Sequence, residues 1–492
     1  MKLSEYADLD ATALAALIRS GEVSAAEVAG TATEALEAVQ PEVNALVSGP
    51  FDAPLDHAAD GPFAGVPFAV KDLITHAAGV PTRSGSRLLG DGVPMPADTH
   101  LMARFRRAGL ATLGLTATPE MGFNANTEPV ATGSVRNPWD LARSPGGSSG
   151  GASALVASRA LPVAHGNDGG GSIRIPAAAC GLVGLKPSQG RTSPGPDYGD
   201  PLMGLGVEFA LTRTVRDCAG LLDAVHGYEP GDRYLLPDPR RPYAAEADAG
   251  SRPLRIALHT EPFSGNGAVD PRCVEAVEAV GRTLEGLGHQ VDRAAPDLDP
   301  TMFDDANFVA WCSFLADGID TISAALGVRP GPELLEATTL ACAELGRTLR
   351  ASDIYAAERA FNVVRRAVGV FHQQWDLILT PTMNVPNTAA GHLNADDAAL
   401  EARGWYDRIF STAGFTALSN VTGNPAISLP LGITEENWPI GVQFVAPYAD
   451  EATLIGLAGD LERALPWHER RPSTVVGWTV GTQADANAVR NA

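Results

Sequence analysis

Hydrophobic residues along this chain fall into two kinds of pattern, and the two alternate. Short apolar runs at 66–70, 111–115 and 161–164 lie next to glycine-rich turns, as is typical of buried strands. The segments between them repeat apolar residues at helical spacing. Strands that alternate with helices indicate an α/β fold. We therefore predict one large domain with a mixed, mainly parallel central β-sheet that helices cover on both faces.

This domain is expected to extend over residues 1–475 and to consist of successive parts. Its beginning has the pattern of two amphipathic helices, the second starting after Ser24. Residues 60–220 carry most strand and glycine-turn patterns and are the expected catalytic core. Residues 230–375 are largely helical, with a single strand pattern at 254–258, and are expected to shape the pocket.

Strand patterns return in the last part of the domain, residues 376–465. These strands are expected to share a sheet with the core, and a final helix should follow them. The tail, residues 476–492, is predicted to be mobile. The strand and helix patterns lie at 376–381, 426–430, 440–445 and 452–464.

The charge balance limits the partners of this chain. Of its 492 residues, 58 are Asp or Glu and 36 are Lys or Arg, which gives a formal charge of −22. An acidic surface repels nucleic-acid phosphates and anionic lipids. We therefore expect a small-molecule partner, and neither nucleic-acid nor membrane binding.

The cysteines do not have the pattern of a disulfide framework or a metal site. They are odd in number, widely spaced and lack a C-x-x-C motif. The N-terminal segment also lacks the apolar block of a signal peptide. We expect a cytoplasmic protein that holds no metal. The cysteines are Cys180, Cys218, Cys273, Cys312 and Cys342.

Two serines lie in a glycine-rich segment, Ser144-Pro-Gly-Gly-Ser148-Ser149-Gly-Gly151. Its glycines suit close backbone approach to a substrate, and a flexible surface loop is the alternative. Residues 146–150 also match the G-x-S-x-G nucleophile elbow, a motif that must directly follow a strand. Residues 136–145 do not have a strand pattern, so the elbow is disfavoured.

A second glycine loop lies at Gly166-Asn-Asp168-Gly-Gly-Gly-Ser172-Ile-Arg174-Ile-Pro176. A short strand is expected before it and a helix after it. Consecutive glycine N–H groups at a helix N-terminus can hold an anion, which in acyl transfer is the tetrahedral oxyanion. A phosphate loop or a plain turn is the alternative, but no Gly-Lys-Ser/Thr ending supports phosphate binding. Ser172 beside such a loop is a candidate nucleophile.

A serine nucleophile needs a base, and the chain offers two candidates. His165 is near in sequence, but no acidic residue is placed to complete a triad with it, which favours a structural role. Lys71 follows an apolar strand, and a surface lysine is the alternative. The ordinary lysine pKa, about 10.4, must fall by roughly two to three units before the amine is a useful base at neutral pH.

Three motifs together resemble the amidase signature family, at the spacing that this family uses. They are Gly65-Val-Pro-Phe-Ala-Val-Lys71-Asp72, Gly146-Gly-Ser148-Ser-Gly-Gly151 and Asp168-Gly-Gly-Gly-Ser172-Ile-Arg-Ile-Pro-Ala177. The strong resemblance covers about 60–220, and a weaker one covers 376–455. It implies the amidase signature fold and an amidohydrolase that cleaves C–N bonds without a cofactor. It also implies a possible homodimer.

The resemblance implies a role for each motif. Ser172 is expected to form an acyl-enzyme, Ser148 to follow a cis peptide bond and relay protons, and neutral Lys71 to act as the base. Gly169 replaces a larger residue common in the family, which is expected to loosen the oxyanion hole or widen the pocket. The expected backbone donors of that hole are Gly169, Gly170, Gly171 and Ser172, and the expected supporting residues are Ser149, Asp168 and Arg174.

Residues 163–168, 190–196 and 465–468 further resemble the 6-aminohexanoate cyclic dimer hydrolase branch of this family. This implies small linear or cyclic amides as substrates. Two alternatives stay open: the glutamine-hydrolysing subunit of a tRNA-dependent amidotransferase, and a non-catalytic binding protein of the same fold. The pocket residues suggested by the resemblance are Met121, Gly122, Phe123 and Cys312.

Overall fold

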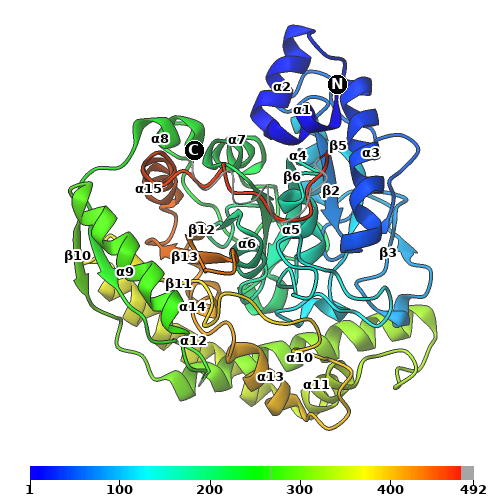
Figure 1. Cartoon of the computed structure of the whole chain (residues 1–492). Helices are drawn as coiled ribbons and strands as arrows, with labels where there is room; N and C mark the ends of the chain where they lie inside the picture. The colour runs from blue at the N-terminus through cyan, green and yellow to red at the C-terminus, as the bar shows by residue number, and fades with distance from the viewer. Residues whose placement is uncertain (266, 478–492) are drawn as a thin grey trace.

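A large mixed sheet forms the centre of the protein. The computed structural model describes residues 1–265 and 267–477 (Figure 1). The strand patterns predicted from the sequence are confirmed, and β10, which carries mostly polar residues, is a strand that the pattern missed. In spatial order the sheet consists of β10 (Gln290–Arg293), β9 (Arg255–Leu258), β11 (Leu377–Pro381), β13 (Pro439–Val445), β12 (Ala426–Ile433), β7 (Val183–Lys186), β8 (Val207–Thr212) and β6 (Val163–Asp168).

Antiparallel pairs outnumber parallel pairs in this sheet. Strand β9 pairs in parallel with β10 and β11, whereas the five pairs from β11 to β6 are antiparallel. The expectation of a mainly parallel sheet is therefore wrong, although the sheet is mixed as predicted. Parallel neighbours need a long crossover connection. Residues 434–438 join β12 to β13 directly, and the connection from β7 to β8 contains no α-helix.

A smaller sheet meets the large one at the strand that carries Lys71. It consists of β1 (Leu46–Ser48), β5 (Ala111–Thr116) and β2 (Pro67–Lys71), and β2 packs against β6 of the large sheet. At this seam the backbone N–H of Lys71 donates to His165 Nδ1 at 3.2 Å. A histidine side chain therefore connects the two sheets beside Lys71. Strands β3 (Pro81–Thr82) and β4 (Val93–Pro94) form a separate short pair.

Helices surround the sheets (Figure 1). The helices are α1 (Leu3–Asp8), α2 (Ala11–Ser20), α3 (Ala25–Val43), α4 (His100–Ala108), α5 (Gly150–Ala157), α6 (Arg174–Cys180), α7 (Val215–Val225), α8 (Tyr243–Ala249), α9 (Pro271–Gly286), α10 (Pro300–Leu326), α11 (Ala337–Thr348), α12 (Ala351–Phe371), α13 (Ala402–Phe410), α14 (Ala417–Thr422) and α15 (Glu451–Ala464), with 3₁₀ turns η1 (Arg87–Leu89), η2 (Glu120–Gly122) and η3 (Pro201–Gly204).

The two faces of the large sheet pack into two hydrophobic cores. On β11, Leu377 and Leu379 belong to one core and Ile378, between them, belongs to the other, because successive strand side chains point to opposite faces. Val277 of α9 packs in the first core and Phe361 of α12 packs in the second. Helices thus cover both faces, as predicted.

The N-terminal part of the chain differs from the sequence prediction in its number of helices. The first part contains three helices instead of two, because Asp10 caps a new helix through its bond to the Ala13 N–H. Ser24 begins α3, and its Oγ accepts from the Glu27 N–H at 3.1 Å. Of the tail predicted to be mobile, residues 478–492 lie outside the described part of the chain.

Helix α10 is the most apolar long helix of the region that was expected to shape the pocket. Within the residues that the structure describes, it alone is long and apolar enough to cross a membrane by length and composition. Its Phe303, Trp311 and Leu315 are buried in the second core. In Figure 1, α10 lies beside α11 and α12 in the green to yellow part of the molecule.

Candidate active site

Lys71 lies at the end of β2 with its side chain fully buried, so the alternative of a surface lysine is wrong. The preceding residues of β2 are buried as well, and they carry the lysine into the interior. Its Nζ lies 2.7 Å from Ser148 Oγ, 3.1 Å from Ser149 Oγ and 2.5 Å from Asn167 Oδ1. The Lys71 amine thus joins β2 to the loop that carries Ser148 and Ser149 and to β6, which carries Asn167.

The charge of Lys71 depends on its surroundings. Burial lowers the pKa of Lys71 to about 7, although the negative charges of Glu208 and Asp168 act in the opposite direction. A fully buried ammonium loses its hydration, and this loss outweighs the attraction of two carboxylates. A large fraction of Lys71 is therefore a neutral amine near pH 7, as the sequence argument required.

Ser148 lies in the loop before α5 and not after a strand, which rules out the nucleophile elbow. The Gly147–Ser148 peptide bond is cis. A side chain at position 147 would meet the backbone oxygen of Asn126 at 2.5 Å, so glycine is required there. The Ser149 N–H donates to the Ser172 carbonyl at 3.2 Å and connects the two glycine loops.

Ser172 lies between β6 and α6, as the strand, loop and helix pattern predicted. The Gly171 N–H donates to Asp168 Oδ1 at 2.7 Å and is not available to a ligand. The N–H groups of Gly169, Gly170 and Ser172 make no hydrogen bond to any described residue. The structure therefore leaves three of the four predicted oxyanion donors free and removes Gly171 from the set.

Asp168 and Arg174 form a buried ion pair beneath this loop. Arg174 Nε and Nη2 donate to the two carboxylate oxygens at 2.9 and 2.8 Å. Burial alone would raise the pKa of Asp168. The positive charge and hydrogen bonds of Arg174, together with the hydrogen bond that Asn420 donates, lower this pKa to about 2. The remaining contacts of Arg174 are with Thr416 O, Ser419 Oγ, Asn420 Oδ1 and Gln443 Oε1.

Ser148 and Ser172 line one small cavity, although no hydrogen bond joins their hydroxyl groups in this part of the described chain. Ser172 also lines an adjoining cavity beside Phe123 and Phe410. The wall of the first cavity is mostly apolar, with Asn167, Asp168 and Glu208 as polar members beside the two serines. Its apolar lining consists of Leu73, Ile74, Met121, Pro201, Leu202, Trp311 and Phe314, with Gly122, Gly169 and Gly206.

Three of the four predicted pocket residues border these cavities, and Cys312 does not. Met121 and Gly122 border the first cavity, and Phe123 borders the second. Cys312 is fully buried next to Cys342, whereas its neighbour Trp311 borders both cavities. Helix α10 thus contributes Trp311, and not Cys312, to the walls of the two cavities.

Gly169 does not widen the cavity as expected. A Cβ atom at this position would lie 2.9 Å from Leu202 Cδ2 and 3.3 Å from the Trp311 ring. Trp311 in turn stacks on Phe123, with ring centroids 4.4 Å apart. The space left by the missing side chain is therefore filled by Leu202 and Trp311.

His165 is a structural partner of Lys71 and not the base of Ser172. Its Nδ1 accepts from the Lys71 backbone, so the ring proton is on Nε2, which lies 3.0 Å from Glu208 Oε2. Both ring nitrogens are thus occupied. Sequence analysis missed Asn167 and Glu208. Both are polar side chains within buried strands, and a buried polar group needs a hydrogen-bond partner. This pattern could have marked them as candidates for the site.

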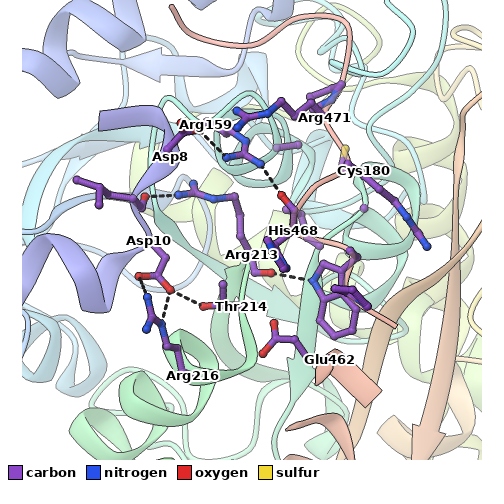
Figure 2. A pocket seen from close by; sticks show the side chains of 18 of the residues that line it. Asp8, Asp10, Arg159, Cys180, Arg213, Thr214, Arg216, Glu462, His468 and Arg471 are labelled. Carbon is purple, nitrogen blue, oxygen red and sulfur yellow. Dashed lines mark hydrogen bonds and ion pairs between the residues drawn. The ribbon is translucent and has the colours of Figure 1, made fainter. Parts of the chain in front are cut away.

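A larger cavity lies elsewhere, between the N-terminal helices and the segment after α15 (Figure 2). Several of its charged groups are paired: Arg216 binds Asp10 through two hydrogen bonds, and Arg159 and Arg471 both contact Asp8. Cys180 borders it, but burial raises the pKa of this thiol to about 12. Size alone therefore does not identify the site, because this cavity holds no nucleophile beside a neutral base among the residues described.

The cysteine and acidic side chains do not gather into a metal-binding cluster in the described part of the chain. All five cysteines are free and buried. Across residues 1–265 and 267–477, no group of three or more His, Cys, Asp or Glu side chains is arranged to hold a metal ion.

Comparison with known proteins identifies the family. The model of the family described as Amidase matches residues 27–455. The chain belongs to the amidase family. It is 39% identical to the 6-aminohexanoate-cyclic-dimer hydrolase of Paenarthrobacter ureafaciens, with 94% of this chain and 96% of that protein covered. It is 37% identical to the putative amidase AmiC of Mycobacterium tuberculosis, with 94% and 95% covered.

A solved structure of 6-aminohexanoate cyclic dimer hydrolase superposes with a TM-score of 0.89 at 37% identity, covering 95% of this chain and 99% of that one. These findings confirm the α/β fold and the resemblance to the amidase signature family. This amidase is a hydrolase that acts on carbon–nitrogen bonds.

Proposed function

We propose that this amidase hydrolyses small linear or cyclic amides through an acyl-enzyme on Ser172, with Ser148 as proton relay and Lys71 as base. The observation that carries the proposal is the 2.7 Å contact of Lys71 Nζ with Ser148 Oγ, at the wall of a cavity that Ser172 also borders. The free N–H groups beside Ser172 supply the donors that a developing oxyanion needs.

The contacts of Lys71 support one order of proton transfers. A neutral amine has two protons and one lone pair. Asn167 Oδ1 and Ser149 Oγ can accept the two protons, which leaves the lone pair for the proton of Ser148. Ser148 can then take the proton of Ser172 as that oxygen attacks the amide carbon.

The second half of the cycle returns each proton. When the C–N bond breaks, Ser148 gives its proton to the departing nitrogen and regains one from Lys71. Water then enters, loses a proton along the same path and releases the acid from Ser172. The N–H groups of Gly169, Gly170 and Ser172 stabilise the oxyanion in both halves.

The substrate class follows from the cavity and from the relatives. The mostly apolar wall suits a methylene chain, and two of the relatives that match nearly the full length are 6-aminohexanoate cyclic dimer hydrolases. We therefore propose this cyclic dimer as the first substrate to test. These relatives favour a stand-alone hydrolase over a glutamine-hydrolysing subunit. Location in the cytoplasm and assembly into a homodimer stay predictions.

The decisive experiment compares the wild type with Ser172→Ala on the cyclic dimer, a linear amide, an aryl amide and glutamine. Products are measured by mass spectrometry. Loss of the nucleophile is expected to lower turnover by about 10⁴-fold or more.

Ser158→Ala is a matched control, because Ser158 is also buried but its hydroxyl bonds only the carbonyl of Leu155 among the residues that the structure describes. It should retain wild-type turnover. Activity that survives in Ser172→Ala would contradict the mechanism. Release of ammonia from glutamine alone would point to the amidotransferase subunit instead.

A further inference from the structure

Glu208 is a buried carboxylate that the proposed mechanism does not use. It lies on β8 opposite Asn167 of β6, and only 4% of it is exposed. Its Oε2 accepts from Thr75 Oγ1 and from His165 Nε2, both at 3.0 Å. Its Oε1 makes no hydrogen bond to any residue in the described part of the chain.

This carboxylate borders the same cavity as Ser148 and Ser172. Among the described residues that line the cavity there is no lysine and no arginine. A carboxylate removed from water needs a cation or hydrogen-bond donors to offset the loss of hydration. The fixed Oε2 sets the orientation of the group, and Oε1 is left to accept from a ligand. The geometry therefore suits a positively charged group bound inside the cavity.

A cyclic amide places such a group there during the reaction. When its C–N bond breaks, the nitrogen does not leave, since it stays attached to the acyl chain on Ser172. A tethered amine has a high effective concentration at the ester and can attack it to close the ring again. Attack requires the lone pair of the neutral amine. An ammonium ion has no lone pair and cannot reverse the reaction.

We propose that Glu208 binds the newly freed amine of a ring-opened substrate as an ammonium ion and so prevents ring closure before water reaches the ester. The nitrogen has received one proton from Ser148 on bond cleavage, and it takes the second from water. An N–H bond forms and a water O–H bond breaks, and the hydroxide ion left behind is neutralised when the released carboxylic acid loses its proton. This inference rests on the proposed hydrolysis of cyclic amides and adds a specificity-determining residue to it.

The test compares Glu208→Gln with the wild type on two substrates. Gln keeps the shape and an oxygen that accepts from Thr75 and His165, but it removes the charge. The cyclic dimer is compared with N-butylhexanamide, a linear amide of similar chain whose amine diffuses away. The loss of kcat/KM on the cyclic dimer is expected to exceed the loss on the linear amide by about tenfold, the size of one charge-assisted hydrogen bond.

Hydroxylamine gives a second readout, because it captures the acyl-enzyme faster than water does. It should restore consumption of the cyclic dimer by Glu208→Gln and change that of the wild type little. Thr75→Val is the matched control: it removes a hydrogen bond to the same carboxylate but keeps the charge. This variant should lose activity equally on both substrates.

Equal losses of Glu208→Gln on both substrates, without hydroxylamine rescue, would overturn the inference and show that Glu208 only supports His165 and Lys71. The proposed function would then stand, provided the wild type opens the ring. A wild type that leaves the cyclic dimer intact would overturn both proposals together. Thermal unfolding of each variant ensures that the comparison is made on folded protein.

Discussion

Two lysines of this protein are equally buried but differ in what they meet. Burial lowers the pKa of both Lys71 and Lys186 to about 7. Lys71 contacts two serine hydroxyls beside a cavity, whereas Lys186, at the end of β7, donates to the carbonyl of Pro187 at 2.9 Å and borders neither cavity of the site. A lowered pKa thus makes an amine neutral, and only a neighbouring hydroxyl with access to substrate makes it a base.

The sharpest test of this comparison replaces each lysine in turn. Lys71→Ala is expected to lower kcat by about 10³-fold, because general-base assistance to Ser148 is lost. Lys186→Met keeps a side chain of similar length and should change kcat by less than about threefold, because Lys186 borders neither cavity of the site. Steady-state hydrolysis of the cyclic dimer measures both. Comparable losses in the two variants would remove the distinction.

Lys186→Met should also change stability in a defined direction. The pKa of Lys186 is about 7 in the folded protein and near 10.5 in the unfolded chain, so the unfolded state binds more protons between these pH values. Stability therefore rises with pH in that window. Removing the lysine should raise the free energy of unfolding at pH 7 by roughly 4 kcal/mol and flatten this rise. Urea unfolding at pH 7 and pH 10 measures both effects.

A substitution of Asp168 probes the charge near both lysines, because the Asp168 carboxylate raises the pKa of Lys71 and of Lys186. Asp168→Asn leaves Arg174 buried without its ion-pair partner and should lower the free energy of unfolding by about 3 kcal/mol at pH 7. The folded pKa of Asp168, about 2, lies below its ordinary value of 3.8. Its stabilisation is therefore full above pH 4 and lost as the pH falls to 2.

Asp292→Asn, at an exposed site on β10, is the control for this prediction and should change stability little. Chemical unfolding is compared at pH 7 and at the lowest pH where the wild type stays folded. A variant as stable as the wild type at pH 7 would show that the ion pair contributes nothing to the nucleophile loop.

The smallest effect is a shift in pH dependence. Because Lys71 must be neutral, kcat/KM of the wild type should rise with pH through about 7 and then level off. The charged groups facing Lys71 are Glu208 and Asp168, and both raise its pKa. Glu208→Gln should therefore move this rise to lower pH, by less than about one unit. A rise that stays in place on the linear amide would show that Lys71 is not the titrating group.

The residues proposed as catalytic stand out in the sequence because each lies in a short motif at the end of a strand or in a glycine loop. The direction of neighbouring strands could not be predicted, because hydrophobic periodicity shows which residues are buried and not how strands pair. The residues that line the cavities were harder still to predict. Helix α10 is apolar over most of its surface, and a shift of one residue turns a helical side chain by about 100°. The apolar pattern therefore does not show which of Trp311 and Cys312 faces the cavity, and of these two only Trp311 borders it.

Glu208 and Asn167 illustrate a second limit. Each is a polar residue in a buried strand, which signals that a partner exists, but the partners are distant in sequence. Asn167 meets Lys71 and Glu208 meets Thr75, contacts that join strands with loops far along the chain. Only the pairing of β6 with β8 and the seam with β2 bring these groups together.

The close fit of Trp311 against Gly169 has an evolutionary consequence. A larger residue at position 169 would collide with the indole and with Leu202 unless both moved. The two positions are therefore expected to change together among relatives, with a small residue at 311 wherever 169 carries a side chain. A mutant library that varies position 169 alone would sample mostly inactive proteins, and one that varies 169, 202 and 311 jointly would reshape the substrate range.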